Sequence, residues 1–281
     1  MKRMLINATQ PEELRVAITE GNLLYDLDIE NISEIRRKGN IYKGKVSRIE
    51  PSLGAAFVNY GAERHGFLPF KEISPQFYPE KHNRNSRLSV SDCLKKDQEI
   101  LVQVEKDERG NKGAALTTNI SLAGRYLVLM PNNPKAAGIS RRLEGKERDK
   151  LKERIASLNV PESMGLIVRT AGEGKDLEDL KWDLEYLQRV WEGISEANTL
   201  RNSPILIFKE SDIIIRALRD YLKEDIEEIW VDTEEAFEEP LNSLSVSCPI
   251  KQKFLISTKI LFPFSLDIKL NLKSRLLIKE K

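Results

Sequence analysis

Short apolar runs separated by turn residues open the chain. Residues 13–18 and 23–29 are rich in β-forming residues and flank a Gly-Asn turn, and a similar run at 3–8 precedes them. Two such runs around a Gly-Asn turn predict a β-hairpin. The basic stretch 36–40 then breaks the pattern. We place a domain boundary near it.

Residues 40–118 contain only short β-type runs. The runs are 41–49, 55–60, 66–69 and 99–104. Several short strands at close spacing predict a small β-barrel. Pro, Asn, Ser and basic residues interrupt the pattern at 74–91, which predicts a long mobile loop. A second turn, 107–113, is predicted to link the last two strands.

Beyond residue 119 the pattern alternates between strands and helices. Residues 126–130 and 164–170 predict strands, and 228–232 predicts a further strand. Residues 146–157 and 176–199 carry apolar residues at helical spacing, which predicts two amphipathic helices. The strand at 164–170 runs into a Gly-rich turn ahead of the second helix. This part of the chain is therefore predicted to be α+β.

The last 42 residues, 240–281, differ in composition from the rest. They contain no Gly and no Ala, and eight Lys and Arg stand against two Asp and Glu. One interpretation is a basic, partly helical tail that binds RNA or a partner. The other is an aberrant segment, because a bias towards Lys, Ile, Leu, Phe, Ser and Asn is typical of an AT-rich gene read out of frame.

Charge and cysteine content exclude several classes of protein. Lys and Arg number 45 against 44 Asp and Glu, so the chain is not a globally basic nucleic-acid binder. Cys93 and Cys248 have no neighbouring Cys or His, which excludes a disulfide framework and a zinc site. No signal peptide or integral membrane segment is predicted. We therefore expect a cytoplasmic protein with reduced thiols.

The barrel region interleaves aromatic and basic residues, a combination that holds single-stranded nucleic acid by stacking and by phosphate contacts. The aromatic residues are Tyr42, Phe57, Tyr60 and Phe67; the basic ones are Lys43, Lys45, Arg48, Arg64, His65, Lys106, Arg109 and Lys112. The alternative for each aromatic ring is a place in the barrel core. A further basic group in the predicted loop, Lys81 to Arg87, is equally explained as solvated charge.

The Gly-rich turn at 168–175 could bind a terminal phosphate. Arg169 offers a planar set of donors, Thr170 a hydroxyl, and the turn its backbone N–H groups. The alternative is an ordinary strand-to-helix connection with a surface arginine. Arg141 and Arg142 form a second cationic patch, which could also be merely solvated.

Motifs of complete catalytic sites are absent from the sequence. It has no P-loop, no HExxH and no Ser, His and Asp in a hydrolase order, and only two histidines. The residues by themselves predict an RNA-binding module without a complete catalytic site.

Six long motifs resemble the N-terminal part of the bacterial ribonuclease E/G family, over about residues 1–237. They are MKRMLINAT (1–9), NIYKGKV (40–46), YGAERHGFLP (60–69), ERGNKGAALTT (108–118), LVLMPN (127–132) and GLIVRTAG (165–172). The family acts as a Mg²⁺-dependent, single-strand-specific endoribonuclease in mRNA decay and in rRNA and tRNA processing.

The resemblance implies an α+β, multidomain fold. Its parts are a split RNase H-like fold at 1–35 and 212–239, an inserted S1-type OB barrel at 36–118, a 5′-sensor domain at 119–211, and the aberrant tail 240–281. It implies RNA binding by Phe57, Phe67 and Lys112. It also implies 5′-monophosphate binding by Arg169, Thr170 and the backbone of Val128, with Arg141 and Arg142 near the RNA path.

The resemblance ends near Glu239, before the family's DNase I-like domain with its catalytic Mg²⁺ and before its structural Zn²⁺ motif. We therefore expect a truncated chain that binds single-stranded, preferably 5′-monophosphorylated RNA, but not DNA. We expect it to be a monomer without a cofactor that cannot cleave by itself. The alternative is a non-catalytic RNA-binding regulator that uses the basic tail as an extra contact.

Overall fold

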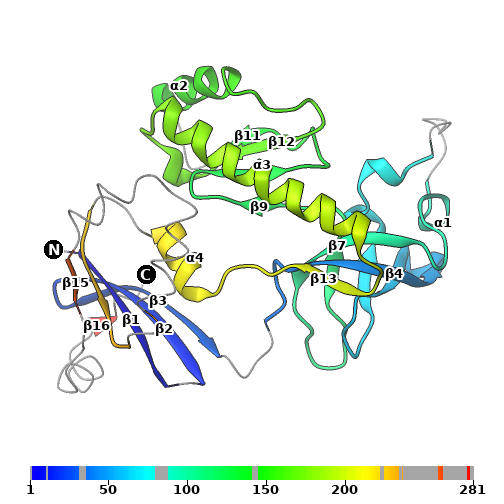
Figure 1. The fold of residues 1–281 in the computed structure, drawn as a ribbon, viewed down its shortest axis with the longest axis horizontal. Coiled ribbons are helices and arrows are strands. Elements are labelled where there is room, and N and C mark those ends of the chain that lie inside the picture. The colour runs from blue at the N-terminus through cyan, green and yellow to red at the C-terminus, as the bar shows by residue number, and fades with distance from the viewer. Residues whose placement is uncertain are drawn as a thin grey trace. The chain divides into compact units, whose positions relative to one another are not determined.

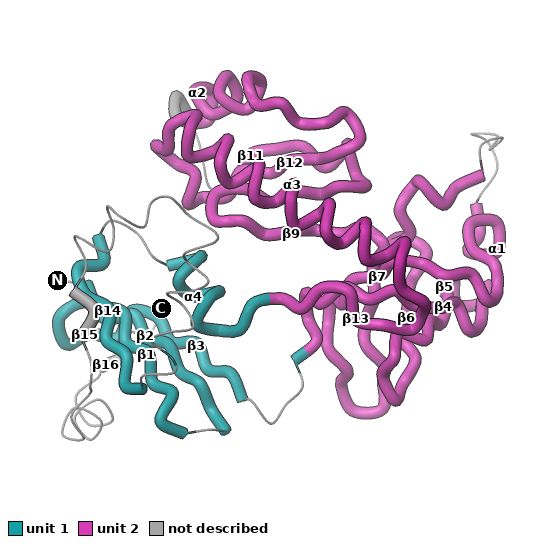
Figure 2. Tube along the Cα trace, viewed as in Figure 1, with its two compact units in different colours: residues 1–36, 211–281 teal, residues 37–210 magenta. Residues whose placement is uncertain are grey.

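Two compact units make up the chain (Figure 2). One comprises residues 1–36 with 211–281 and the other residues 37–210. The computed structural model describes residues 2–10, 12–31, 36–79, 88–140, 145–221, 225–233, 236, 259–261 and 277–278. The first unit is thus built from both ends of the sequence, and the second is inserted between them.

Among its described residues, the first unit contains a six-stranded sheet against which helix α4 packs (Figure 1). The strand order is β15-β14-β1-β2-β3-β16. The elements are β1 (Lys2–Gln10), β2 (Glu13–Glu20), β3 (Leu23–Asn31), α4 (Ile213–Tyr221), β14 (Ile226–Val231), β15 (Lys259–Leu261) and β16 (Leu277–Ile278). β1, β2 and β3 pair antiparallel in sequence order, which confirms the predicted hairpin.

The core of this unit joins the two ends of the chain. β14 pairs parallel to β1, with Met4 opposite Ile229. Helix α4 contributes Ile213 and Ala217 to a core that also contains Met4 and Val16. Burial of these apolar side chains is what stabilises the pairing of such distant segments.

Two short segments of the 240–281 region belong to the same sheet. β15 pairs parallel to β14, and β16 pairs parallel to β3, so they extend the sheet at its two edges. The tail residues that the structure describes are therefore strands. The other residues of 240–281, on which the partly helical interpretation depends, lie outside the described residues.

The second unit begins with a closed barrel. Its strands are β4 (Ile41–Glu50), β5 (Ala55–Asn59), β6 (Gly66–Pro69), β7 (Glu99–Lys106) and β8 (Ala115–Thr117). The order is β4-β5-β6-β8-β7, and β4 also pairs with β7, which closes the barrel. This confirms the predicted β-barrel. Closure leaves its five strands without a free edge among themselves.

The predicted loop 74–91 is only partly described. Short 3₁₀ turns lie in and before it, and helix α1 lies at its end; residues 80–87, with the basic group noted above, lie outside the described residues. These elements are Pro51–Leu53, Phe70–Glu72, Pro75–Phe77 and α1 (Val90–Cys93).

Among the described residues, the rest of the second unit comprises a four-stranded sheet, two helices and β13, which joins the sheet of the barrel. The elements are β9 (Leu122–Ala123), β10 (Leu127–Met130), β11 (Gly138–Ile139), α2 (Gly145–Ala156), β12 (Gly165–Val168), the 3₁₀ turn Thr170–Gly172, α3 (Leu177–Leu200) and β13 (Ile205–Phe208). The sheet order is β11-β12-β10-β9. Asp176 caps α3, since its side chain accepts from the Asp179 N–H at 2.8 Å. The predicted α+β pattern is confirmed.

The barrel and the α+β part are tied together inside this unit. β13, which follows α3, pairs antiparallel with β4. The Lys43 ammonium donates to the backbone carbonyls of Asn198 (3.0 Å) and Arg201 (2.8 Å) at the end of α3. A cation at this end of a helix satisfies carbonyls that lack a partner within the helix.

Candidate nucleic-acid interface

The four aromatic residues of the barrel divide into two pairs. Tyr42 and Tyr60 are buried, with 9% and 1% of their surface exposed, and pack edge to face in the core. Phe57 and Phe67 are only half-buried. The core explanation therefore holds for the tyrosines, and the phenylalanines are left on the outside of the barrel.

Phe57 and Phe67 face each other across β5 and β6. They are register partners in the antiparallel ladder, and their ring centroids lie 5.8 Å apart at an interplanar angle of 66°. Their neighbours Ala56, Val58 and Leu68 are fully buried. Because side chains alternate between the two faces of a strand, the burial of these neighbours directs both rings outward.

Basic and polar side chains surround this ring pair. The Arg48 guanidinium lies 4.8 Å from the centroid of the Phe57 ring, a cation–π contact. The Ser47 hydroxyl donates to the Phe57 carbonyl at 3.0 Å and lies 3.0 Å from Nδ1 of His65. The surface thus combines aromatic faces with cations.

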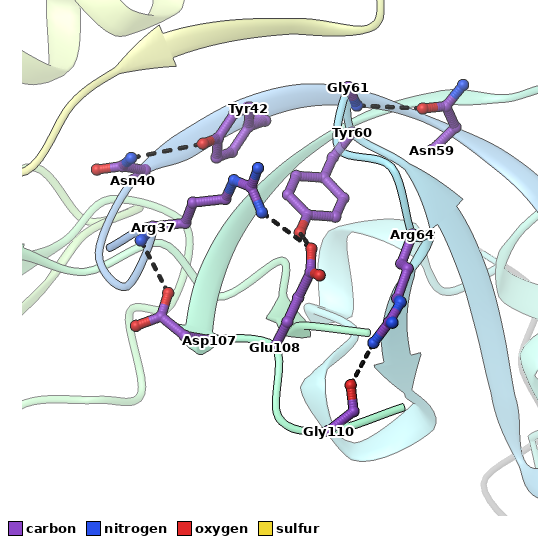
Figure 3. A network of polar contacts seen from close by, with 10 residues as sticks. All are labelled: Arg37, Asn40, Tyr42, Asn59, Tyr60, Gly61, Arg64, Asp107, Glu108 and Gly110. Carbon is purple, nitrogen blue, oxygen red and sulfur yellow. Dashed lines mark hydrogen bonds and ion pairs between the residues drawn. The ribbon is translucent and has the colours of Figure 1, made fainter. Parts of the chain in front are cut away.

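Lys112 lies exposed between β7 and β8, in the turn that the sequence predicts at 107–113. Arg109 and Lys112 each donate a backbone N–H to the other's carbonyl at 3.1 Å. The Arg64 guanidinium donates to the Gly110 carbonyl from the neighbouring loop (Figure 3). The Phe67 N–H donates to the Ala114 carbonyl at 2.8 Å, so the turn ends beside the ring pair.

A partly buried polar network holds the base of this turn. The Arg37 guanidinium (2.9 Å) and the Tyr60 hydroxyl (3.0 Å) both donate to one oxygen of Glu108 (Figure 3). Burial, followed by the hydrogen bond to Glu108, raises the pKa of the Tyr60 phenol, which therefore stays a neutral donor. The Asp107 carboxylate accepts from the Arg37 N–H at 2.8 Å. The turn that presents Lys112 is thus pre-organised.

One cation of the predicted set serves another purpose. The Lys43 side chain is 12% exposed and pairs with Glu99 at 2.9 Å in addition to its contacts at the end of α3. It is a structural link within the unit, which corrects its inclusion among the basic residues that could follow RNA phosphates.

Arg169 and Thr170 lie at the end of β12. The Arg169 N–H donates to the Tyr126 carbonyl at 2.8 Å, and its guanidinium donates to the Gly124 carbonyl at 2.5 Å. Thr170 begins the 3₁₀ turn and is exposed. The arginine is half-buried, and its guanidinium is held by the backbone beside an exposed hydroxyl.

Basic side chains gather around Tyr126, next to this turn. The Arg125 guanidinium and the Lys175 ammonium lie 5.4 and 5.9 Å from the ring centroid. Together with Arg169 they make the surroundings of the turn positive, a setting that favours an anion.

Val128 lies in the middle of the sheet beside the turn. β10 runs between β12 and β9, and Val128 is opposite Ile167 on one side and Ala123 on the other. Arg141 and Arg142 lie outside the described residues.

Sequence reasoning missed one residue of this site. Asp183, on α3, accepts hydrogen bonds from the backbone that precedes β10. Its position falls between Leu180 and Leu187 on the buried face of the helix. A lone carboxylate on an apolar helical stripe is the signal that could have found it.

The part of the chain that the structure describes contains no cluster of three or more His, Cys, Asp and Glu side chains suited to a metal ion. Nor do these residues include a helix of the length and apolar character needed to cross a lipid bilayer.

Two family models match the chain over the regions just described. The description "S1 RNA binding domain" matches residues 36–119, which contain the barrel, its ring pair and Lys112. The description "Ribonuclease E/G family" matches residues 121–263, which contain Arg169 and Thr170. The chain belongs to the ribonuclease E/G family. This family match continues beyond residue 239, into the segment that composition sets apart.

Individual relatives agree with this assignment. The chain is 60% identical to ribonuclease E of Escherichia coli over 238 residues, which are 85% of this chain and 22% of that protein. It is 58% identical to ribonuclease E of Haemophilus influenzae over 249 residues, 89% of this chain and 27% of that protein. Ribonuclease G of Escherichia coli is 36% identical over 250 residues, which are half of that protein.

The same comparisons show how much of each relative this chain covers. This ribonuclease E/G family chain spans about a quarter of the length of the two ribonuclease E relatives.

Proposed function

We propose that this chain is the RNA-binding portion of a ribonuclease E-type enzyme. In this proposal the barrel face holds single-stranded RNA, and the turn at Arg169 and Thr170 receives a 5′-monophosphate. The observation that carries the proposal is the outward-facing pair Phe57 and Phe67 on an S1 RNA binding domain, next to the exposed Lys112.

The barrel face suits single-stranded RNA. Unpaired bases can stack on the two rings, which every base can do because each has a π-face. Lys112 and Arg48 supply positive charge for the adjacent phosphates. A 2′-hydroxyl distinguishes RNA from DNA at such a surface, so we expect DNA of the same sequence to bind less well.

The turn suits a terminal monophosphate. A guanidinium donates planar, charge-assisted hydrogen bonds to phosphate oxygens, and Thr170 adds an exposed hydroxyl beside it. A 5′-hydroxyl lacks the anion and a 5′-triphosphate is bulkier, so both should bind less well. Arg141 and Arg142, which lie outside the described residues, remain candidates for contacts near the RNA path.

RNA cleavage in mRNA decay and rRNA processing would depend on parts of the family enzyme that this chain does not match. In this proposal the catalytic Mg²⁺ and the structural Zn²⁺ would also be bound by those parts. The proposal also includes a monomeric chain that acts in the cytoplasm. Membership of a nuclease family favours this function over that of an independent regulator.

Binding of a fluorescent RNA tests the proposal. We would compare 5′-monophosphate, 5′-hydroxyl and 5′-triphosphate forms of one unstructured RNA of about 12 nucleotides, a length that an OB fold can cover. DNA of the same sequence serves as a control, and EDTA prevents cleavage by trace nucleases. The expected order of affinity is monophosphate, then hydroxyl and triphosphate RNA, then DNA. Equal affinity for RNA and DNA would contradict the barrel assignment, and equal affinity for all three 5′ ends would contradict the phosphate turn.

A further inference from the structure

Asp183 is the one charged side chain, among those the structure describes, that is fully buried. It lies on α3 with 5% of its surface exposed, and Leu180, Leu184 and Leu187 are buried on the same helix. Removing a carboxylate from water is costly unless hydrogen bonds or charges compensate. Its neighbourhood should therefore contain specific partners.

Three consecutive backbone amides are those partners. The Arg125 N–H donates to Oδ1 at 3.1 Å, and the N–H groups of Tyr126 and Leu127 donate to Oδ2 at 2.9 Å each. Successive amides directed at one point form an anion-binding concavity, which here is filled by a side chain of the protein itself. Both carboxylate oxygens accept hydrogen bonds. In an asparagine the side-chain NH₂ group would replace one of these oxygens and would face a backbone N–H, so a donor would meet a donor.

Gly124 allows the carboxylate to lie this close. A Cβ atom added at Gly124 would lie 2.5 Å from Oδ2 and 2.6 Å from Oδ1 of Asp183. Any side chain at this position would displace the carboxylate. The turn 124–127 and Asp183 thus form one closely packed unit.

The same turn provides two backbone acceptors that hold Arg169. Its Tyr126 carbonyl accepts from the Arg169 N–H, and its Gly124 carbonyl accepts from the guanidinium. A continuous path of hydrogen bonds therefore leads from Asp183 through the turn to Arg169.

The same groups act on the charge of Asp183. Burial raises the pKa of the Asp183 carboxyl, whereas the three amides and the positive charge of Arg169 oppose that shift.

We propose that Asp183 is a positioning residue, which holds the 124–127 turn and through it the Arg169 guanidinium in the geometry that receives a 5′-monophosphate. This inference rests on the proposed function of the phosphate turn. The carboxylate itself does not meet the RNA, since it is buried and negatively charged. Because it already occupies the amides of residues 125–127, the phosphate is directed to Arg169 and Thr170.

Two variants test this inference on the full chain. Asp183→Asn removes the charge and one acceptor with almost no change in size. Gly124→Ala leaves the Asp183 carboxylate intact but pushes it away from the turn. Both should lower the preference for 5′-monophosphate over 5′-hydroxyl RNA by about tenfold, or roughly 1.4 kcal/mol, with little change in the affinity for 5′-hydroxyl RNA. Hydrogen exchange at the amides of residues 125–127 should become faster in both variants.

Matched controls lie on the same helix. Glu185→Gln removes an exposed carboxylate, and Gly193→Ala adds a methyl group where no atom lies within 4 Å. Neither should change the preference. Circular dichroism and thermal melting establish that each variant is folded.

The outcomes separate the two proposals. If the unmutated chain prefers the monophosphate and folded Asp183→Asn keeps that preference, the positioning role is wrong and the phosphate turn stands. An equal loss of affinity for both RNAs would also overturn it, because Asp183 would then act only on the fold. If the unmutated chain has no preference, the proposed phosphate turn fails, and this inference fails with it.

Discussion

The barrel face and the phosphate turn are built on different physical principles. On the barrel, Phe57 and Phe67 stand on adjacent hydrogen-bonded strands above an apolar core, so the backbone beneath them is rigid whatever the rings do. The turn at Arg169 is assembled from the ends of three elements and is held by backbone carbonyls and one buried carboxylate. Loss of a side chain should therefore act locally on the barrel, whereas the turn should respond to changes in residues that never touch the ligand.

The largest predicted effect is a loss of stability of the barrel, at a position where two backbone segments lie in close contact. In Gly113→Ala the new Cβ would lie 2.1 Å from the His65 carbonyl oxygen, which cannot move without shifting the start of β6 at Gly66. We expect the free energy of unfolding to fall by about 3 kcal/mol, at the upper end of overpacking effects. Urea denaturation measures it. Gly138→Ala, with no atom within 4 Å, is the control and should be nearly neutral; similar stabilities for the two variants would contradict the packing at Gly113.

The next effect concerns the turn alone. Arg169→Gln removes the charged donor and should weaken binding of 5′-monophosphate RNA by about 1.5–3 kcal/mol, the range for hydrogen bonds to charged groups. Affinity for 5′-hydroxyl RNA should hardly change. Fluorescence anisotropy with both RNAs checks this. A parallel loss for both would mean that the two sites are not separate.

On the barrel the corresponding change is Phe57→Ala. Loss of one stacking ring should weaken binding by about 1–3 kcal/mol. Unlike Arg169→Gln, it should weaken 5′-monophosphate and 5′-hydroxyl RNA equally, and Phe67→Ala should do the same. Tyr42→Phe, which keeps a buried ring, serves as the control in the same titration. Unchanged affinity in both phenylalanine variants would exclude this face as the RNA site.

The smallest effect concerns the link between the two parts. Hydrogen bonds from Ser203 and Lys43 lower the pKa of Glu99 to about 2 from its ordinary value of 4.5. Because the folded pKa lies below the unfolded one, the contribution of Glu99 to stability is present above about pH 4.5 and is lost as the pH falls towards 2. Glu99 is partly exposed, so the change should be small.

Urea midpoints at a series of acidic pH values measure this contribution. In Glu99→Gln the corresponding part of the pH dependence should disappear. An identical pH profile for the variant and the unmutated chain would show that the contact with Lys43 and Ser203 adds nothing to stability.

Much of the fold was predictable because it depends on local patterns. The strands of the barrel, the hairpin at β2 and β3 and the long helix α3 all follow from apolar spacing and from turn residues nearby in the chain. The alternation around Phe57 and Phe67 also contains the information that both rings point outward, since small or aliphatic residues flank each of them. These features need no knowledge of distant partners.

Long-range contacts determine the rest. The pairing of β13 with β4 joins residues about 160 positions apart, and no local signal of either strand specifies the other. The role of Lys43 likewise depends on the place where α3 ends, which made it indistinguishable in sequence from the cations of the RNA face. Asp183 is the clearest case. The sequence by itself places a carboxylate on an apolar helical stripe, but only the tertiary structure brings three amides of a turn nearly sixty residues away to its oxygens, because a buried charge must find its partners wherever the fold supplies them.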